Sequence, residues 1–292
     1  MKADKQGWIL VTGVGGPAGR NATKYLRQKG YMVIGTDMRH VETEANTFHV
    51  VPAADHPDFI SALQEIVRNS RASLLIPTVS EELPVISKAK SCLASTGCMV
   101  MIAPCAAIAT AHDKLLTAQY LEQRNISVPR SLDGSVSHQE AAATLGFPLI
   151  AKPRISRGGR GVVLHSDLAE LESEHRKGIV YQQFASGQEF DVNLFRDHKG
   201  KIQSCVVLAK TQLREGNVGN ALAVERVQRE DVAEVARGAC ESIGLTGPAD
   251  MDIRLDGDGI PRLLEINARL GANVLSAEEV IESLLAEWQA FI

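Results

Sequence analysis

Two short predicted strands around a tight turn near the C-terminus constrain the fold of this chain more than any other stretch. Segments 249–255 and 261–269 flank Asp256-Gly257-Asp258-Gly259, residue types that tolerate the backbone angles of a sharp reversal. Side chains of a strand alternate between two faces. A register with Asp252 opposite Glu265 places the apolar side chains on one face, so we predict an antiparallel hairpin with that face covered.

This register collects the polar side chains on the other face. The polar face holds Asp250, Asp252, Arg254, Glu265 and Asn267, and the apolar face holds Met251, Ile253, Leu264 and Ile266. Clustered carboxylates raise one another's pKa unless a cation lies among them. Oxygen ligands at this density suit a hard ion such as Mg²⁺. A solvated hairpin face is the alternative, because a polar face opposite an apolar one is common in antiparallel sheets.

Composition narrows the possible classes of function. The 292 residues, 45% of them hydrophobic, suffice for two or three compact units. A formal charge of -4 and an aromatic content of 4% favour neither a nucleic-acid partner nor single-strand stacking. Five cysteines without paired zinc spacing predict reduced thiols in a cytoplasmic protein. We find no signal peptide and no apolar run long enough to cross a bilayer, so no membrane partner is expected.

The N-terminal third alternates predicted strands with predicted helices. The expected strands are 8–12, 31–36, 73–77 and 99–103, and the expected helices are 21–29, 58–69 and 82–95. Such alternation is typical of a parallel sheet with helices outside it. We therefore expect residues 1–105 to form a Rossmann-like α/β domain.

The first turn of this unit is rich in glycine. Gly15 and Gly16 lie in the run 13–19, where free backbone N–H groups at a helix start suit an anion. Asp37 follows at the place of a ribose-binding acid, so the pattern fits a dinucleotide site and an NAD-dependent oxidoreductase or epimerase. A Rossmann-like domain without a dinucleotide is the alternative.

The loop 78–82 follows the carboxyl end of a predicted strand. Ligands of open α/β sheets bind at such ends, so Glu81 could meet a substrate ammonium group. The alternative is a plain helix N-terminal acid, which the helix dipole favours.

The rest of the chain predicts an α+β arrangement. The expected helices are 106–123, 137–145, 231–242 and a final helix after a capping box of Ser276 and Glu279, and the expected strands are 147–153, 162–165, 179–184, 187–195 and 202–210. Residues 214–220 are predicted to form a polar loop.

Lys152 stands in an otherwise apolar strand, where an ammonium group is costly unless an anion meets it. The segment 156–161 follows with three glycines and two arginines, which suits a loop that closes over phosphates. It lacks the lysine and hydroxyl of a P-loop, which excludes a Walker-type site. A plain basic hairpin is the alternative for this loop, and Lys114 alone suggests a surface lysine.

In this order and spacing, the motifs resemble those of the ATP-grasp superfamily, nearest to its carbamoyl-phosphate-synthase-like and carboxylate–amine ligase members. The resemblance covers nearly the whole chain. It implies a Rossmann-like pre-ATP-grasp domain over 1–105, which explains a glycine-rich turn without NAD. It further implies a two-lobed ATP-grasp domain over 106–292, with a flap lobe at about 125–180 and a metal-binding lobe at about 181–292.

The resemblance also implies roles for individual residues. The nucleotide would be bound by Lys114, Lys152, Gly158, Gly159, Arg160, Gly161, Gln182, Gln183, Phe184, Ala185 and Glu189. Asp252, Glu265 and Asn267 fall on the ligands of Mg²⁺, with Mn²⁺ as a substitute. Arg269, with Arg214 or Lys210, would stabilise the transferring phosphoryl group, and the substrate candidates are Glu81, Gly15 and Gly16.

The implied activity is an ATP-dependent ligase. It would phosphorylate a carboxylate to an acyl phosphate and join it to an amine, with small molecules as partners and a homodimer as a compatible assembly. Two departures stand out: Gln182 replaces a common hinge glutamate, and Asn267-Ala268-Arg269 replaces a common Asn-Pro-Arg. The chain also stops about one helix after the metal residues. A nucleotide-binding subunit without turnover is therefore a further hypothesis.

Overall fold

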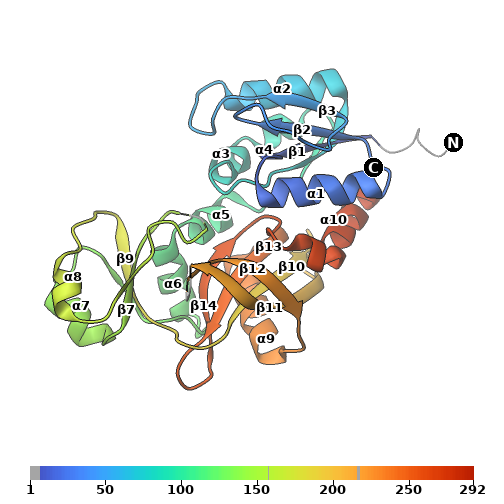
Figure 1. The fold of residues 1–292 in the computed structure, drawn as a ribbon. Helices are drawn as coiled ribbons and strands as arrows, with labels where there is room; N and C mark the ends of the chain where they lie inside the picture. Colours follow the sequence, from blue (N-terminus) through green and yellow to red (C-terminus); the bar gives the residue numbers. More distant parts are fainter. Residues whose placement is uncertain (1–6, 157, 216–217) are drawn as a thin grey trace.

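The structure, a computed structural model, describes residues 7–156, 158–215 and 218–292, with the side chains of 213–220 outside that description. Its fold is mixed α/β, with one parallel and two antiparallel sheets (Figure 1). Among the described residues, no helix combines the length and the apolarity needed to cross a membrane.

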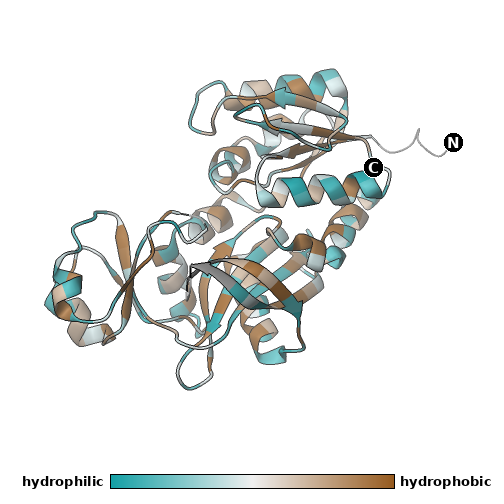
Figure 2. Cartoon of the chain, in the orientation of Figure 1, coloured by the Kyte–Doolittle hydropathy of each residue, from teal (hydrophilic) through white to brown (hydrophobic). Residues whose placement is uncertain are grey.

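The N-terminal unit is a five-stranded parallel sheet of order β3-β2-β1-β4-β5. Its elements are β1 (Trp8–Thr12), α1 (Pro17–Gln28), β2 (Val33–Asp37), β3 (Thr47–Val50), α2 (Phe59–Ser70), β4 (Ala72–Ile76), α3 (Leu83–Lys88), α4 (Lys90–Ala94) and β5 (Met99–Val100). The alternation of strands and helices is therefore as predicted. Apolar residues follow the strands and the helix faces that cover them (Figure 2).

Three details of this unit differ from the prediction. The helix expected at 82–95 is two helices, α3 and α4, that meet at Ala89. The strand expected at 99–103 has two residues in ladder pairing. Strand β3 was not predicted, because it lies at the sheet edge with three of its four residues exposed and so lacks an apolar pattern.

A four-stranded antiparallel sheet of order β6-β9-β7-β8 forms the lobe drawn in green and yellow in Figure 1. It follows the helices α5 (Cys105–His112) and α6 (Lys114–Glu122) and contains β6 (Ser131–Asp133), α7 (His138–Leu145), β7 (Leu149–Pro153), β8 (Val163–His165), α8 (Leu168–Glu172) and β9 (Ile179–Gln183). Its small core joins α7 and α8 to β7 and β9. The turn that contains Gly158 to Gly161 connects β7 to β8.

The C-terminal unit is a five-stranded antiparallel sheet of order β12-β11-β10-β13-β14. Its elements are β10 (Glu189–Arg196), β11 (Ile202–Glu215), β12 (Val218–Arg226), α9 (Glu230–Ile243), β13 (Gly247–Leu255), β14 (Pro261–Asn267), the 3₁₀ turn η1 (Val274–Ser276) and α10 (Glu278–Phe291). The loop predicted at 214–220 is wrong: β11 extends to Glu215 and pairs with Val218 of β12. Backbone pairing between the two long strands overrides their polar composition there.

The hairpin of β13 and β14 has the predicted register at the residues proposed to bind the metal. Asp252 pairs with Glu265 and Asp250 pairs with Asn267. The register shifts between Asp252 and Ile253, so that Leu263 rather than Leu264 packs in the apolar core. The predicted place of Leu264 is therefore wrong, because one extra residue in a strand turns the side chains beyond it to the other face.

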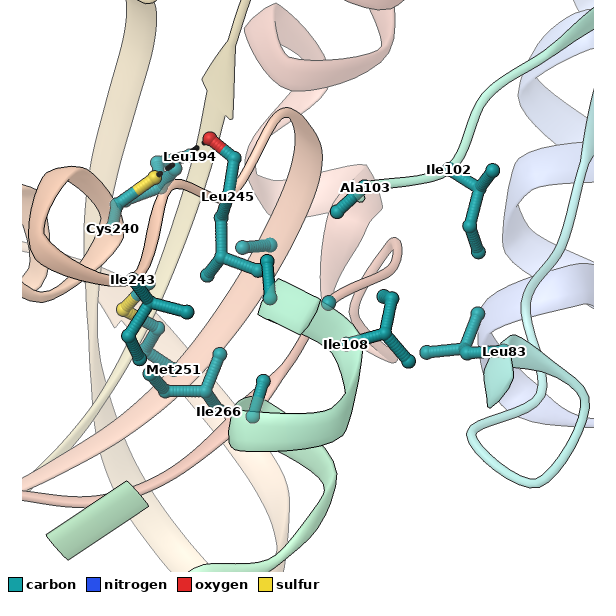
Figure 3. Close-up of a cluster of buried hydrophobic side chains, with 14 of the residues drawn as sticks. Leu83, Ile102, Ala103, Ile108, Leu194, Cys240, Ile243, Leu245, Met251 and Ile266 are labelled. Carbon is teal, nitrogen blue, oxygen red and sulfur yellow. Dashed lines mark hydrogen bonds between the residues drawn. The ribbon is translucent and has the colours of Figure 1, made fainter. Parts of the chain in front are cut away.

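Two hydrophobic clusters connect the units. One runs from the N-terminal sheet through α5 to the hairpin, and Ile108 of α5 lies beside Leu83 of α3 in it (Figure 3). The other packs α10 against α1 and both large sheets, with Trp288 fully buried. The predicted capping box of Ser276 and Glu279 is absent, since Ala277 is the N-cap of α10 and Arg226 binds both the Ser276 carbonyl and the Glu279 carboxylate.

Candidate functional site

Most of the predicted nucleotide residues line one pocket between the two antiparallel sheets. The lining includes Lys152, Gly158, Gly159, Gln182, Gln183, Phe184, Ala185, Glu189, Asp252, Leu264 and Glu265. They come from β7, the following loop, β9, β10, β13 and β14. Gly158 and Gly159 have positive φ angles of 62° and 73°, which glycine adopts without strain. The fold therefore gathers residues that are up to 113 positions apart in the sequence.

Two buried lysines approach Glu265 from different elements. Lys114 begins α6 at a turn capped by Asp113, and its Nζ lies 3.1 Å from Glu265 Oε2 and 2.8 Å from the Ser156 carbonyl oxygen. Burial tends to raise the pKa of Glu265, but the ammonium groups of Lys114 and Lys152 outweigh it and hold this pKa at about 2. Lys114, which alone suggested a surface lysine, is 6% exposed.

Lys152 is 5% exposed and lines the pocket, whereas Lys114 lines a small cavity that also borders Glu265. Its Nζ donates to Gln182 Oε1 at 2.8 Å and to the Leu264 carbonyl at 3.2 Å. Burial lowers the pKa of Lys152 to about 8, although the Glu265 carboxylate opposes the shift. The Gln182 amide nitrogen donates to Ser131 Oγ at 3.0 Å, so this hinge side chain is engaged at both ends. Gln182 thus orients Lys152.

Lys210 bridges two carboxylates on the neighbouring strands. Its Nζ lies 2.5 Å from Glu189 Oε1 and 2.6 Å from Asp252 Oδ1. Burial tends to lower the pKa of Lys210, but the two carboxylates prevail and raise it above its usual value. Arg254 adds a second cation 3.5 Å from Glu189 Oε2. The side chain of Arg214 lies outside the described residues, so its predicted role has no structural account.

The three predicted metal ligands lie on neighbouring positions of the two hairpin strands. They are Asp252 of β13 and Glu265 and Asn267 of β14. Asp252 and Glu265 are paired across β13 and β14. Burial raises the pKa of Asp252 to about 7, with Lys210 opposing and Glu265 reinforcing the shift. Among the described residues no three His, Cys, Asp or Glu side chains form a metal cluster. Two carboxylates and one amide still fit a hard divalent ion that completes its coordination with other oxygens.

Arg269 lies at the edge of this oxygen cluster. Its guanidinium donates to Asn267 Oδ1 at 3.0 Å, to Asp250 Oδ2 at 3.3 Å and to the Leu270 carbonyl at 2.7 Å. It also donates to Ser80 Oγ at 3.2 Å, a residue of the loop after β4. The predicted arginine and the predicted metal residue Asn267 are therefore in direct contact.

The predicted substrate residues line a second cleft of about 760 Å³ at the carboxyl edge of the parallel sheet. Gly15, Gly16 and Glu81 line it together with Asp37, whose Oδ2 accepts from the Gly15 N–H at 3.0 Å. Arg160 also lines this cleft and not the nucleotide pocket. Gly161, the last residue of the loop 158–161, is exposed, and its carbonyl accepts a hydrogen bond from Arg176.

Several site residues were missed from the sequence. Ser80, Ser131, Ser156 and Leu264 all touch or line the site, although Ser156 begins the glycine-rich segment 156–161 and Ser80 lies in the loop 78–82. Ser80 had a detectable signal, because it follows the carboxyl end of a strand in a parallel sheet. Ser131 is brought in by the pairing of β6 with β9, and Leu264 by the register shift in the hairpin, which no local pattern reports.

A family model described as the ATP-grasp domain matches residues 111–273. The chain belongs to the ATP-grasp family. This match confirms the predicted family and covers the lysines, the loop after β7, the hinge and the hairpin.

Individual relatives in this family are distant. The chain is 30% identical over 179 residues to D-alanine–D-alanine ligase of Stutzerimonas stutzeri, a match that spans 55% of this chain and 56% of that ligase. It is 22% identical over 298 residues to the carbamoyl phosphate synthase large chain of Thermotoga petrophila, spanning 94% of this chain and 27% of that synthase. The chain thus spans about half of the first relative and a quarter of the second.

Solved structures share the fold across nearly the whole chain. The L-amino acid ligase from Bacillus licheniformis superimposes with a TM-score of 0.72 at 20% identity, covering 93% of this chain and 69% of that one. The N5-carboxyaminoimidazole ribonucleotide synthetase from Thermotoga maritima gives a TM-score of 0.68 at 18% identity, covering 94% and 72%. At these identities the likeness concerns the fold.

Proposed function

We propose that this ATP-grasp chain is an ATP-dependent ligase that activates a small carboxylate as an acyl phosphate and joins it to an amine. The observation that carries the proposal is the convergence of Lys114 and Lys152 on Glu265, where the pocket that Lys152, Asp252 and Glu265 line meets a small cavity that Lys114 lines. Two ammonium groups next to paired carboxylates suit a phosphate chain held together with a divalent ion. The names of the relatives, among them a D-alanine–D-alanine ligase, agree with this class of reaction.

In this proposal residues 1–105 are a Rossmann-like pre-ATP-grasp domain and residues 106–292 the two-lobed ATP-grasp domain. ATP would lie with its adenine between Leu264 and the hinge 182–185, and Glu189 would accept hydrogen bonds from the ribose hydroxyls. The pocket holds about 90 Å³, below the roughly 300–1,000 Å³ of typical ligand sites. Binding would therefore require Gly158 and Gly159 to move away from β14 before they close over the phosphates.

The metal would be Mg²⁺ or Mn²⁺, held by Asp252, Glu265 and Asn267. When bound, it would supply positive charge to the phosphate oxygens and help to align them. The protein's own part is to keep Glu265 ionised through Lys114 and Lys152, and to hold Asp252 in place through Lys210. Glu265 and Asp252 already have lysine ammonium groups as partners. The positive charge of the divalent metal would therefore balance the negative charge of the phosphates when both enter.

The reaction would proceed in two displacements. A carboxylate oxygen of the substrate attacks the γ-phosphorus in line, the bond to the bridging oxygen breaks, and ADP leaves. Arg269 stabilises the charge on the transferring group, with Arg214 or Lys210 as further cations. The nitrogen of the amine then attacks the acyl carbon, and phosphate departs as the amide forms. The loop 158–161 would exclude water, because an exposed acyl phosphate hydrolyses.

We place the carboxylate and amine substrates in the cleft of Gly15, Gly16 and Glu81, since ligands of parallel sheets bind at the carboxyl edge. Arg160 reaches this cleft from the flap side and could recognise the anionic substrate. The five cysteines are free thiols, which supports a cytoplasmic setting. A homodimer is compatible with the proposal and is not needed by it.

The variant Glu265→Gln tests the proposal. We expect at least a hundredfold loss of phosphate release from MgATP in the presence of small carboxylates and amines, because the change removes one carboxylate ligand. Nucleotide affinity, measured by calorimetry, should fall much less. Glu241→Gln, an exposed change on α9, is the control.

If the Glu265→Gln variant releases phosphate as fast as the wild type, Glu265 does not bind the metal. If the wild type binds MgATP and releases no phosphate with any substrate mixture, the chain is a nucleotide-binding subunit without turnover.

A further inference from the structure

The loop after β4 separates the two clefts, and its residues divide between them. Val79, Glu81 and Glu82 line the N-terminal cleft with Gly15 and Gly16. Ser80, in the middle of this run, points the other way and borders a small cavity shared with Lys114, Glu265 and Asn267. A single loop therefore touches both the cleft proposed for the substrates and the residues proposed for phosphoryl transfer.

Ser80 contacts two of the residues proposed for phosphoryl transfer, Asn267 and Arg269. It is 8% exposed, its hydroxyl donates to Asn267 Oδ1 at 3.4 Å, and it accepts from Arg269 Nε at 3.2 Å. The Arg269 Nη2 donates to the same Asn267 oxygen at 3.0 Å. Ser80, Asn267 and Arg269 thus form a closed triangle of hydrogen bonds that fixes the amide and the guanidinium relative to each other.

The base of the loop is held firmly to the parallel sheet. The Thr78 N–H donates to Thr12 Oγ1 at 3.2 Å, and Thr78 Oγ1 donates to the Thr12 carbonyl at 2.6 Å. Thr12 is the last residue of β1 and directly precedes the glycine-rich turn of the cleft. The Thr12 hydroxyl also bonds to Glu82, at the other end of the loop. A ligand that displaces the glycine-rich turn would therefore act on the loop that carries Ser80.

We propose that Ser80 is a positioning residue that orients Asn267 and Arg269 and so connects the substrate cleft to the phosphoryl-transfer site. This inference rests on the proposed function. A side chain that bonds to a metal ligand fixes the ligand's orientation, and removing such a partner lowers metal affinity or activity by about 10–100-fold. Ser80 bonds to the proposed ligand Asn267 and also to the proposed catalytic cation Arg269.

The test compares Ser80→Ala, Ser80→Thr and Ser87→Ala with the wild type. Ser87 is a matched control, because it is also 8% exposed, and its hydroxyl donates only locally to the Pro84 carbonyl, at 3.0 Å. The first measurement is the Mg²⁺ concentration that gives the half-maximal thermal shift with ADP, which does not depend on turnover. The second is the rate of phosphate release from MgATP, separated into kcat and KM.

We expect Ser80→Ala to raise the Mg²⁺ midpoint about tenfold and to lower kcat about tenfold, with the KM for ATP changed less than threefold. Ser80→Thr keeps the hydroxyl and should restore both values to near those of the wild type. Ser87→Ala should match the wild type in both.

A Ser80→Ala midpoint and kcat within twofold of the wild type, or an equal change in Ser87→Ala, would overturn this inference while leaving the ligase proposal standing. A wild type without any Mg²⁺-dependent shift with ADP would instead overturn the proposed function, and this inference with it.

Discussion

Lys210→Met should destabilise the protein in a way that depends on pH. Lys210 is the ammonium group between Glu189 and Asp252, at 2.5 Å and 2.6 Å, and its side chain is 6% exposed. Methionine has a similar length and fills the same space without a charge. The substitution therefore leaves the buried Glu189 carboxylate close to the partly buried Asp252 carboxylate, with Arg254 as the nearby cation on the Glu189 side.

The size of the loss in the free energy of unfolding follows from the burial of Lys210 and its partner carboxylates. Breaking a buried ion pair on one side costs about 3–5 kcal/mol. The protein can limit this cost by protonating one carboxylate. Burial raises the pKa of Asp252 to about 7, so this protonation becomes easier as the pH falls below 7. We expect the free energy of unfolding to fall by about 3 kcal/mol at pH 7, the lower end of this range, and by clearly less at pH 5.5.

Urea denaturation at both pH values measures these losses. Lys199→Met, an exposed change in the turn between β10 and β11, should alter stability by less than about 0.5 kcal/mol. Millimolar Mg²⁺ should restore part of the stability of Lys210→Met, because a divalent ion at Asp252 replaces some of the lost positive charge. The same salt should affect Lys199→Met no more than the wild type.

A loss below about 1 kcal/mol at pH 7 would refute this reasoning, and so would a loss of the same size at pH 5.5. Either result means that Glu189 and Asp252 do not depend on the Lys210 ammonium group for their burial.

Two further predictions concern other parts of the chain. Hydrogen bonding by Arg176 holds the pKa of Glu174 at about 2, below its usual 4.5, so this carboxylate stabilises the fold above pH 4.5 and the contribution disappears as the pH falls toward 2. Glu174→Gln should lower the free energy of unfolding by about 2 kcal/mol at pH 7 and by much less near pH 2.5 in urea titrations, whereas an equal loss at both pH values would contradict the assignment. Thermal unfolding should shift upward with ATP and Mg²⁺ and remain unchanged with NAD, while a shift with NAD alone would restore the oxidoreductase hypothesis for the turn that contains Gly15.

Local sequence determined the elements whose signals are carried by neighbouring residues. The alternation of strands and helices before residue 105, the register of Asp252 with Glu265, and the lysine in the apolar strand β7 could all be predicted. Each of these depends on a period of two or 3.6 residues, or on a costly residue in an apolar run. The order of the motifs was enough to identify the ATP-grasp family.

Only the tertiary structure decided which side chains meet. Lys114 became a buried partner of Glu265 because α6 packs beside β14, and Leu264 turned into the pocket because the hairpin contains a register shift. Ser80 reaches Arg269 across 189 positions of sequence. Such contacts arise from packing between elements and from a single bulge, and neither leaves a periodic trace in the amino-acid sequence. The sequence by itself therefore determined the chemical groups available to this protein, and the packing of three sheets decided which of them act on one another.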